Sequence, residues 1–326
     1  MKRILVTGAL GQIGYELVLA LRKSYGTETV VASDIRMRPA GEPEAGPFEY
    51  VDCTRLPDLQ DVVRKHDVGT IYHLAALLSA VAEEKPHAAW NVNMGGLYRV
   101  LEVARGNGCS VFFPSSVGAF GPSTPADRTP QDAVQRPTTM YGVTKVAGEL
   151  LCDYYFQRFR VDTRGVRYPG LISHTAPPGG GTTDYAVEIF YQAIRHGRYT
   201  CFLEPDTRLD MMYMPDAIGA AMQLMEADPE RLEHRNAFNI AAMSFTPEEL
   251  ATEIRRHMPE FLIDYEVDPV RQAIADSWPN SVDDSAARRE WGWAPTHDLE
   301  SMVADMLDHL RAAISVAEGE RGRRVK

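Results

Sequence analysis

Three glycines, Gly8, Gly11 and Gly14, stand at regular spacing directly after the first apolar run of the chain. That run, residues 2–7, is rich in residues that favour strands and predicts a buried parallel strand. Residues 15–23 carry apolar side chains at helical spacing and predict a helix. Glycines in such a turn let the backbone approach a phosphate group closely, and the helix N-terminus supplies N–H donors and a positive dipole end. The alternative, a plain tight turn between strand and helix, is disfavoured by the residues that follow.

An acidic residue ends the next predicted strand, which covers residues 29–34. The carboxylate of Asp34 can accept hydrogen bonds from both hydroxyls of an adenosine ribose and would repel a 2′-phosphate. We therefore expect NAD rather than NADP as the cofactor. Arg36 and Arg38 follow closely, and because an arginine can accommodate the 2′-phosphate, NADP stays open as the alternative.

Strand-like and helix-like segments alternate as far as residue 170. Such an alternation is typical of an α/β fold built on a doubly wound parallel sheet of the Rossmann type. We predict a NAD-binding domain at residues 1–170 and a smaller C-terminal α/β substrate-binding domain that takes up most of residues 171–326. The further predicted strands are residues 48–51, 68–74, 110–113 and 161–168, and the further predicted helices are residues 55–66, 86–106 and 139–159.

Two features of the C-terminal half bear on this division. Residues 208–240 are predicted as strand, helix and strand, and we expect them to fold back onto the nucleotide-binding half. The amphipathic pattern of the last helix ends near residue 317. The charged tail from about residue 318 is expected to be disordered.

A tyrosine and a lysine four residues apart, Tyr141 and Lys145, lie in the predicted helix 139–159. This spacing places both side chains on one face of a helix. An ammonium group beside a phenol lowers the pKa of the phenol, and such a tyrosine can take a proton from an alcohol near neutral pH. The pair alone is weak evidence, because the same spacing is common on solvated helix faces. It gains weight because it follows a nucleotide-binding half in the expected order.

Together these motifs resemble the extended short-chain dehydrogenase/reductase family over nearly the whole chain. The resemblance implies a nicotinamide-dependent oxidoreductase or epimerase with Ser116, Tyr141 and Lys145 as its catalytic triad. Ser116 is preferred to Ser115 because it lies at the distance from the tyrosine that this branch shows. The resemblance also implies a homodimer that packs through the predicted helices 86–106 and 139–159. The matching residues are Thr7, Gly8, Gly11, Gly14, Asp34, His73–Ala76, Asn93, Ser116, Tyr141, Lys145, Arg167–Pro169 and the later segments 208–216 and 287–293.

The motifs and the resemblance give a set of expected cofactor contacts. Asp52 could bind the adenine amino group or belong to the start of the helix at 55–66, and both interpretations stay open. Asn93, the polar member of an apolar helix stripe, is interpreted as a buried hydrogen-bonding residue rather than a reactive one. The expected NAD-binding residues are Gly8, Gly11, Gln12, Ile13, Gly14, Asp34, Asp52, Cys53, Leu74, Ala75, Ala76, Asn93, Tyr141, Lys145, Tyr168 and Pro169.

Two branches of the family compete. Sugar-nucleotide epimerases and dehydratases usually have an asparagine shortly after the sixth strand to hold the substrate pyrophosphate, and Gly170 stands there in this chain. By contrast, segments 178–189 and 277–279 look like the short-chain type of L-threonine 3-dehydrogenase, which is epimerase-like in fold and needs no metal. This branch implies NAD-dependent oxidation of L-threonine to 2-amino-3-ketobutyrate with Tyr141 as the base. A NAD-dependent sugar-nucleotide epimerase or dehydratase is the alternative.

The carboxylate and ammonium groups of threonine need opposite partners. Hydroxyls and backbone amides around Thr182 and Thr183 suit the carboxylate, although these residues could equally cap the predicted helix 185–196. Asp184 could meet the ammonium group or cap the same helix, and both interpretations stay open. The expected substrate-binding residues are Ser79, Ser116, Tyr141, Thr182, Thr183, Asp184 and Trp278.

Composition disfavours several other classes of function. The formal net charge of −11 disfavours binding to nucleic acids. The four cysteines are far apart, which argues against a zinc site or a disulfide framework and fits a reducing compartment. The sequence has no apolar run of about 18 residues, so we expect a cytoplasmic protein with no membrane span. A catalytically silent NAD-sensing protein is disfavoured because Tyr141 and Lys145 are both present.

Overall fold

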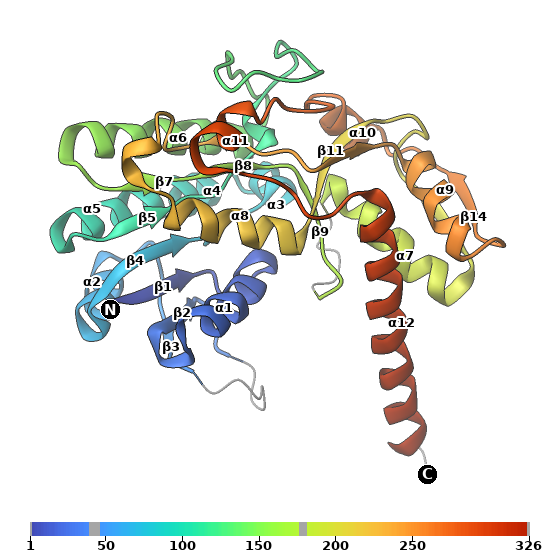
Figure 1. Ribbon diagram of the computed structural model, residues 1–326, viewed down its shortest axis with the longest axis horizontal. Helices are drawn as coiled ribbons and strands as arrows, with labels where there is room; N and C mark the ends of the chain where they lie inside the picture. Colours follow the sequence, from blue (N-terminus) through green and yellow to red (C-terminus); the bar gives the residue numbers. More distant parts are fainter. Residues whose placement is uncertain (1, 39–45, 176–180, 325–326) are drawn as a thin grey trace.

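A six-stranded parallel sheet organises the N-terminal half of the chain in the computed structural model, which describes residues 2–38, 46–175 and 181–324 (Figure 1). The strand order is β3-β2-β1-β4-β5-β7, and every neighbouring pair is parallel. The doubly wound sheet expected from the sequence is thereby confirmed. Its order reverses between β1 and β4, which is where sheets of this kind bind ligands. The strands are β1 (Arg3–Thr7), β2 (Val30–Asp34), β3 (Phe48–Tyr50), β4 (Val68–His73), β5 (Ser110–Phe112) and β7 (Thr163–Arg164).

Helices cover both faces of this sheet, because its strands are apolar on both sides. Ile4 and Val6 of β1 face one hydrophobic core, and Leu5 between them faces another. The first core is closed by α1 and α8, and the second by α2, α5 and α6 (Figure 1). These helices are α1 (Gln12–Tyr25), α2 (Leu56–His66), α5 (Leu97–Asn107), α6 (Met140–Phe159) and α8 (Met214–Glu226).

The sixth predicted strand is divided at Gly165 into two strands of different sheets. Its first part, β7, completes the central sheet, whereas β8 (Val166–Tyr168) lies between β6 (Ser115–Ser116) and β12 (Phe238–Asn239). A Cβ on Gly165 would lie 2.3 Å from the carbonyl oxygen of Phe113. Only glycine allows the two backbones to approach so closely at the point of division.

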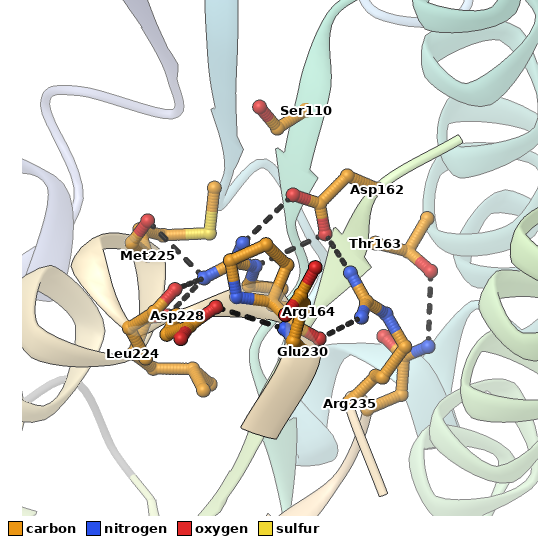
Figure 2. Close-up of polar contacts among 12 residues, drawn as sticks. Ser110, Asp162, Thr163, Arg164, Leu224, Met225, Asp228, Glu230 and Arg235 are labelled. Atoms are coloured by element: carbon orange, nitrogen blue, oxygen red, sulfur yellow. Dashed lines mark hydrogen bonds and ion pairs between the residues drawn. The ribbon is translucent and has the colours of Figure 1, made fainter. Parts of the chain in front are cut away.

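A cluster of charged side chains fastens α8 and the chain that leads to β12 onto the central sheet (Figure 2). Asp162 accepts hydrogen bonds from Arg164 and Arg235 at 2.9 and 2.6 Å. Arg164 also donates to the carbonyl oxygen of Leu224, in the last turn of α8, at 2.8 Å. The side chains of the two arginines are only 5% and 9% exposed, so their charges depend on Asp162 for neutralisation. We propose that α8 and β12 belong with the nucleotide-binding part.

The rest of the chain forms a smaller α/β part with its own hydrophobic core. It has a sheet of order β13-β11-β9 and the parallel pair β10 and β14, and α7, α9 and α12 contribute to the same core (Figure 1). We propose this part as the substrate-binding domain. Its elements are β9 (Gly170–Ile172), β10 (Arg198–Cys201), β11 (Leu209–Tyr213), β13 (Met243–Phe245), β14 (Leu262–Tyr265), α7 (Tyr185–His196), α9 (Pro247–His257), α10 (Pro269–Ala275) and α12 (Leu299–Arg324). The helix α11 (Ser285–Trp291) packs instead against the core of the nucleotide-binding part.

The segment 208–240 is shared between the two parts rather than returning as a whole. Its first strand, β11, pairs with β9 and β13 of the smaller part. Met212 of this strand lies in the core of the nucleotide-binding part, and Met211 and Tyr213 lie in the other core. We propose that the expected fold-back applies to α8 and β12, whereas β11 contributes side chains to both cores.

Two helical predictions need correction. The predicted helix 86–106 contains a π-helical turn, η2 (Trp90–Gly96), between α4 (Pro86–Ala89) and α5. Such turns shift the register of side chains at functional sites, which simple periodicity does not reveal. The last helix, α12, continues to Arg324 rather than ending near residue 317, and disorder of the tail from about residue 318 stays a prediction. Glutamate and arginine favour helix by themselves, which accounts for the continuation.

Another short helix, α3 (Ser79–Glu84), follows β4 and was not predicted from the sequence.

Among the described residues, no helix combines the length and the apolar character that crossing a membrane requires.

Replacing Asp162 with asparagine removes the negative charge that Arg164 and Arg235 share. Burial opposes the ionisation of Asp162, but hydrogen bonds and charge from both arginines outweigh it and hold its pKa below the usual range. We expect Asp162→Asn to lower the free energy of unfolding in urea by about 2 kcal/mol at pH 7. The difference in unfolding free energy between wild type and variant should narrow as the pH falls below about 4. The carboxylate of Asp162 is then protonated in the wild type and no longer stabilises the folded state.

The matched control is Asp264→Asn, which removes an exposed ion pair with Arg198. This change should alter the free energy of unfolding by less than about 0.5 kcal/mol, because exposed pairs contribute little. Equal effects of the two substitutions would contradict the role given to the buried cluster.

Candidate active site

The turn between β1 and α1 is held by close backbone contacts. Gly8 has a φ of +72°, which glycine adopts most readily, and a Cβ there would lie 2.8 Å from the nitrogen of Ala75. A Cβ on Gly14 would lie 2.2 Å from the carbonyl oxygen of Gly8. Gly11 precedes α1 and provides no side-chain cap for the helix that begins with Gln12 and Ile13. A tight glycine turn before an uncapped helix N-terminus fits an anionic group such as a pyrophosphate.

Asp34 ends β2 beside this turn, and its carboxylate is buried and ionised. It accepts hydrogen bonds at 3.0 Å from the nitrogen of Leu10 and from both the backbone and the guanidinium of Arg36. Burial opposes ionisation, but the hydrogen bonds and the charge of Arg36 outweigh it and hold the pKa of Asp34 below its usual range. Arg36 thus binds the very carboxylate that is expected to bind the ribose, a contact that the sequence did not predict.

Asn93 fastens the segment after β4 to α6. Its side-chain oxygen accepts a hydrogen bond from the nitrogen of Leu77 at 2.8 Å, and its amide donates to the Leu77 carbonyl and to Thr144 at 3.1 Å. The interpretation of Asn93 as a buried hydrogen-bonding residue is confirmed. The clamped residue lies shortly after Leu74 and Ala75, whose backbone packs against the glycine turn at Gly8.

Several other expected cofactor residues have partners inside the protein. The carboxylate of Asp52 accepts hydrogen bonds from the nitrogen and the hydroxyl of Thr54 at 2.8 and 2.7 Å, which is a local turn before α2. Tyr168 donates from its hydroxyl to a backbone carbonyl of α8 at 2.8 Å. Cys53 and Pro169 are buried. Contact of these four residues with a cofactor stays a prediction.

Ser116, Tyr141 and Lys145 lie together beyond the carboxyl end of β5. Ser116 ends β6, and the other two are one turn apart at the start of α6, which Thr139 caps. A side-chain hydrogen bond joins Ser116 to Tyr141. The Nζ of Lys145 donates to the carbonyl of Pro114 at 2.6 Å and lies 5.3 Å from the centre of the Tyr141 ring. The sequence therefore identified three side chains that the fold does bring together.

Burial dominates the titration of this pair. It raises the pKa of Tyr141 to about 12, with the hydrogen bond from Ser116 acting in the opposite direction. Burial also lowers the pKa of Lys145 to about 8, against the effect of the carboxylate of Glu149. The expectation that Lys145 lowers the pKa of Tyr141 below its ordinary value is wrong for the protein alone. Removal of the phenol from water outweighs the attraction of the ammonium group.

Sequence reasoning missed Glu149, which lies one turn after Lys145 on the same face of α6. Its carboxylate is 5% exposed and accepts two hydrogen bonds from Arg167, at 3.1 and 2.9 Å. It also accepts a hydrogen bond from the hydroxyl of Ser115, so this hydroxyl binds Glu149 rather than a residue of the candidate catalytic group. The signal that would have found Glu149 is the continuation of the four-residue spacing by one further step.

Three of the expected substrate residues form one helical turn before α7. Thr182–Asp184 make up this turn, η4, and the methyl group of Thr183 would lie 2.7 Å from a Cβ on Gly170. The carboxylate of Asp184 accepts a hydrogen bond from the nitrogen of Gly181 at 2.7 Å, as the capping alternative requires. Residues 177–180 of the preceding loop lie outside the described residues.

Ser79 and Trp278 come from opposite parts of the chain. Ser79 begins α3, directly after the segment that Asn93 clamps. Trp278 follows α10, which packs beside η4, and is partly buried against the core of the smaller part. Both side chains are half-buried, and substrate contact by either stays a prediction.

The fold is that of the epimerase-like short-chain dehydrogenase class. Residues 4–241 match the NAD-dependent epimerase/dehydratase family, and the chain belongs to that family. An uncharacterised epimerase/dehydratase of Staphylococcus haemolyticus is 57% identical over 308 residues, which cover 94% of this chain and 97% of that protein.

Several solved structures are similar to this chain over nearly its whole length. An L-threonine dehydrogenase from Clostridium difficile has a TM-score of 0.94 and 56% identity, covering 96% of this chain and 98% of that one. A monomeric L-threonine 3-dehydrogenase from a metagenome has a TM-score of 0.91 and 46% identity, covering 95% of this chain and 99% of that one. The resemblance inferred from the motifs is confirmed at the level of the family and of its epimerase-like threonine dehydrogenases.

Replacing Gly14 with alanine should disrupt the nucleotide turn. The new methyl group would lie 2.2 Å from the carbonyl oxygen of Gly8 and 2.8 Å from the Cα of Ala9, and no side-chain rotation can relieve backbone contacts. We expect NAD to bind at least about tenfold more weakly in a calorimetric titration.

Gly106→Ala is the control, because a Cβ at this position in α5 meets no atom within 4 Å. It should leave NAD affinity unchanged and raise the free energy of unfolding by up to about 1 kcal/mol through helix propensity. Wild-type affinity in Gly14→Ala would show that the cofactor does not lie against this turn.

Proposed function

We propose that this protein is a NAD-dependent L-threonine 3-dehydrogenase of the short-chain type. It would oxidise the secondary alcohol of L-threonine to the ketone of 2-amino-3-ketobutyrate. The observation that carries the proposal is that Ser116, Tyr141 and Lys145 come together on β6 and α6, in a fold that also has the tight glycine turn between β1 and α1. Similarity to L-threonine dehydrogenases over nearly the whole chain supports the choice of substrate.

The residues around the glycine turn fit NAD. The space beside Gly8 and Gly14 admits no Cβ, which suits a backbone that lies against a pyrophosphate. Asp34 is ionised and can accept the ribose hydroxyls, and its charge disfavours a 2′-phosphate even though Arg36 is paired with it. When bound, NAD⁺ supplies the hydride acceptor and a positive charge that favours a phenolate.

In this proposal Tyr141 is the general base. The alcohol proton passes to its phenolate oxygen, and the hydrogen on the same carbon leaves as hydride. Because the pKa of Tyr141 is about 12 in the protein alone, its deprotonated form needs the positive charges of the complex. Lys145 supplies one of them, and Glu149 helps to keep that ammonium protonated by raising its pKa. Ser116 donates a hydrogen bond to the reacting oxygen and fixes its position.

The helical turn η4 offers partners for both charged groups of an amino acid. Hydroxyls and N–H groups of Thr182 and Thr183 suit the carboxylate. The carboxylate of Asp184 suits the ammonium group while it also caps the turn at Gly181. Ser79 and Trp278 complete the expected set, as a polar contact and an apolar wall.

A sugar-nucleotide epimerase or dehydratase is the alternative, because the family includes such enzymes. That branch usually holds the substrate diphosphate with an asparagine where Gly170 stands here. A Cβ on Gly170 would lie 2.4 Å from the Sδ of Met211 and 2.7 Å from the Cγ2 of Thr183. The position has no room for an asparagine, which favours a substrate without a diphosphate.

The proposal is tested by the absorbance of NADH with purified protein, NAD⁺ and L-threonine, with and without a chelator. We expect NADH to form at the same rate in both samples. Failure with threonine, together with intact NAD binding and conversion of a nucleotide sugar, would favour the epimerase alternative.

Tyr141→Phe should abolish turnover, because phenylalanine keeps the ring but cannot accept the alcohol proton. We expect the turnover number to fall at least about 10³-fold while NAD affinity stays within about twofold. Tyr154→Phe, on the exposed side of the same helix, should retain activity. Substantial turnover in Tyr141→Phe would rule out this residue as the base.

Ser116→Ala should move the pH dependence of kcat/KM to higher pH, because this ratio reports the enzyme before substrate binds. In that state the hydrogen bond from Ser116 opposes the effect of burial and so lowers the pKa of Tyr141. Without this hydrogen bond, the rise of kcat/KM with pH should begin at a higher pH. Ser115→Ala removes a hydroxyl bonded to Glu149 and should leave the midpoint in place. The same midpoint in wild type and Ser116→Ala would contradict the assigned contact.

We also infer that the protein forms a homodimer through α5 and α6. Tyr98 and Tyr154 are about half exposed at 50% and 54%, and both rings contact the buried ring of Tyr155. Leu150 on the same helix as Tyr154 is 62% exposed. Such exposed apolar side chains on adjacent helices suit a partner surface. Sedimentation should give twice the chain mass at micromolar concentration, and a monomer there would contradict the inference.

A further inference from the structure

Three potential metal ligands meet at a place that the proposed reaction does not use. His174 follows β9, and Asp305 and His309 lie one turn apart on α12. One ligand atom from each residue lies within 4.8 Å of the others. The rings of the two histidines stack, with centroids 4.1 Å apart and planes inclined by 19°. These elements carry no residue of the candidate catalytic group.

The hydrogen bonds around the cluster fix the proton positions on both histidines. The hydroxyl of Tyr213 has one proton and donates it to Asp305 at 2.5 Å, so it must accept the hydrogen bond from the Nδ1 of His174 at 2.7 Å. The Nδ1 of His309 contacts the backbone carbonyl of Asp305 at 2.9 Å, and a carbonyl only accepts. Each ring therefore has its proton on Nδ1 and a lone pair on Nε2, which is the tautomer that metal binding needs.

One hydroxyl group lies between two of the three ligands. The Tyr213 oxygen is 2.7 Å from the Nδ1 of His174 and 2.5 Å from the carboxylate of Asp305. Tyr213 thus serves as the outer hydrogen-bond partner that orients a ligating histidine.

A second cluster, formed by Glu233, His234 and Glu290, lacks these properties. The carboxylate of Glu290 already accepts hydrogen bonds from the backbone N–H groups of Glu233 and His234, at 2.8 and 3.1 Å. It also has a hydrogen bond with the side chain of His234. Those bonds explain the cluster as a structural contact between the chain before β12 and α11.

We propose that His174, Asp305 and His309 bind a divalent transition-metal ion of the zinc class. Two imidazoles and a carboxylate are ligands that suit Zn²⁺ and its neighbours better than Mg²⁺ or Ca²⁺. His309 is 52% and Asp305 is 38% exposed, which leaves room for water as a further ligand. The ion would join the segment after β9 to the last helix and would stabilise the smaller part of the molecule. Its role is structural, and the proposed hydride transfer does not pass through it.

The test is a calorimetric titration of the chelator-treated, dialysed full chain with Zn²⁺. We expect the wild type to bind one ion per chain. His309→Asn and His174→Gln should each weaken binding at least about tenfold. His196→Asn, an exposed histidine at the end of α7, is the matched control and should bind as the wild type does.

Co²⁺ provides a second readout, because its visible absorption reports coordination by the protein. Bands that appear with wild type and the control and vanish in both cluster variants would support the site. Absence of Zn²⁺ binding by the wild type, or wild-type affinity in both cluster variants, would overturn it. Thermal melting of each variant without metal separates loss of a ligand from loss of the fold. None of these measurements uses turnover, so the outcome is independent of the proposed function.

Discussion

The buried ion pair between Glu149 and Arg167 connects the candidate active site to the sheet. Both side chains are less than one-tenth exposed, at 5% and 8%, so neither charge can be left without the other. Removing one partner of such a pair costs about 3–5 kcal/mol, although the pair itself adds little net stability. Its effect is therefore positional, because it fixes the rotation of α6 against β8. Lys145, one turn earlier on α6, is set by the same rotation and donates to the carbonyl of Pro114.

Local dipoles, rather than the net charge of the chain, provide the positive potential at the expected cofactor site. A chain with a net charge of −11 offers no positive field to a dinucleotide that is itself negative. The tight glycine turn and the N-terminus of α1 provide backbone dipoles instead. Around the candidate catalytic group, burial shifts the pKa values of Tyr141 and Lys145 in opposite directions, up for the phenol and down for the amine. Both shifts disfavour charge, so the positive charge of a bound NAD⁺ would have a large effect on the phenol.

Much of the fold could be predicted because buried parallel strands are apolar on both faces and therefore appear as short continuous runs. The strands β1, β2, β4 and β5 were found in this way. The short strands β10 and β14 were not predicted, because four residues at the edge of a small sheet leave no distinctive pattern. The division at Gly165 depends on a close approach to Phe113, which only the tertiary structure creates.

The candidate site shows the same limit. Tyr141 and Lys145 could be found because a spacing of four places two side chains on one helix face. The pKa of Tyr141 could not be predicted from the sequence, because it depends on burial by segments that are far away in the sequence. Arg36 was noticed as a partner for a phosphate, but its hydrogen bonds to Asp34 follow from the path of the chain after β2. Glu149 was overlooked because a glutamate on a helix is usually solvated.

The most direct measurement is the fate of the hydrogen on the alcohol carbon of the substrate. L-threonine with deuterium at that carbon would be turned over with NAD⁺, and the reduced cofactor would be analysed by mass spectrometry. The account predicts that the deuterium appears in the NADH, because the hydrogen leaves as hydride while its proton partner passes to Tyr141. Absence of labelled NADH, with NAD bound and the protein folded, would contradict the account.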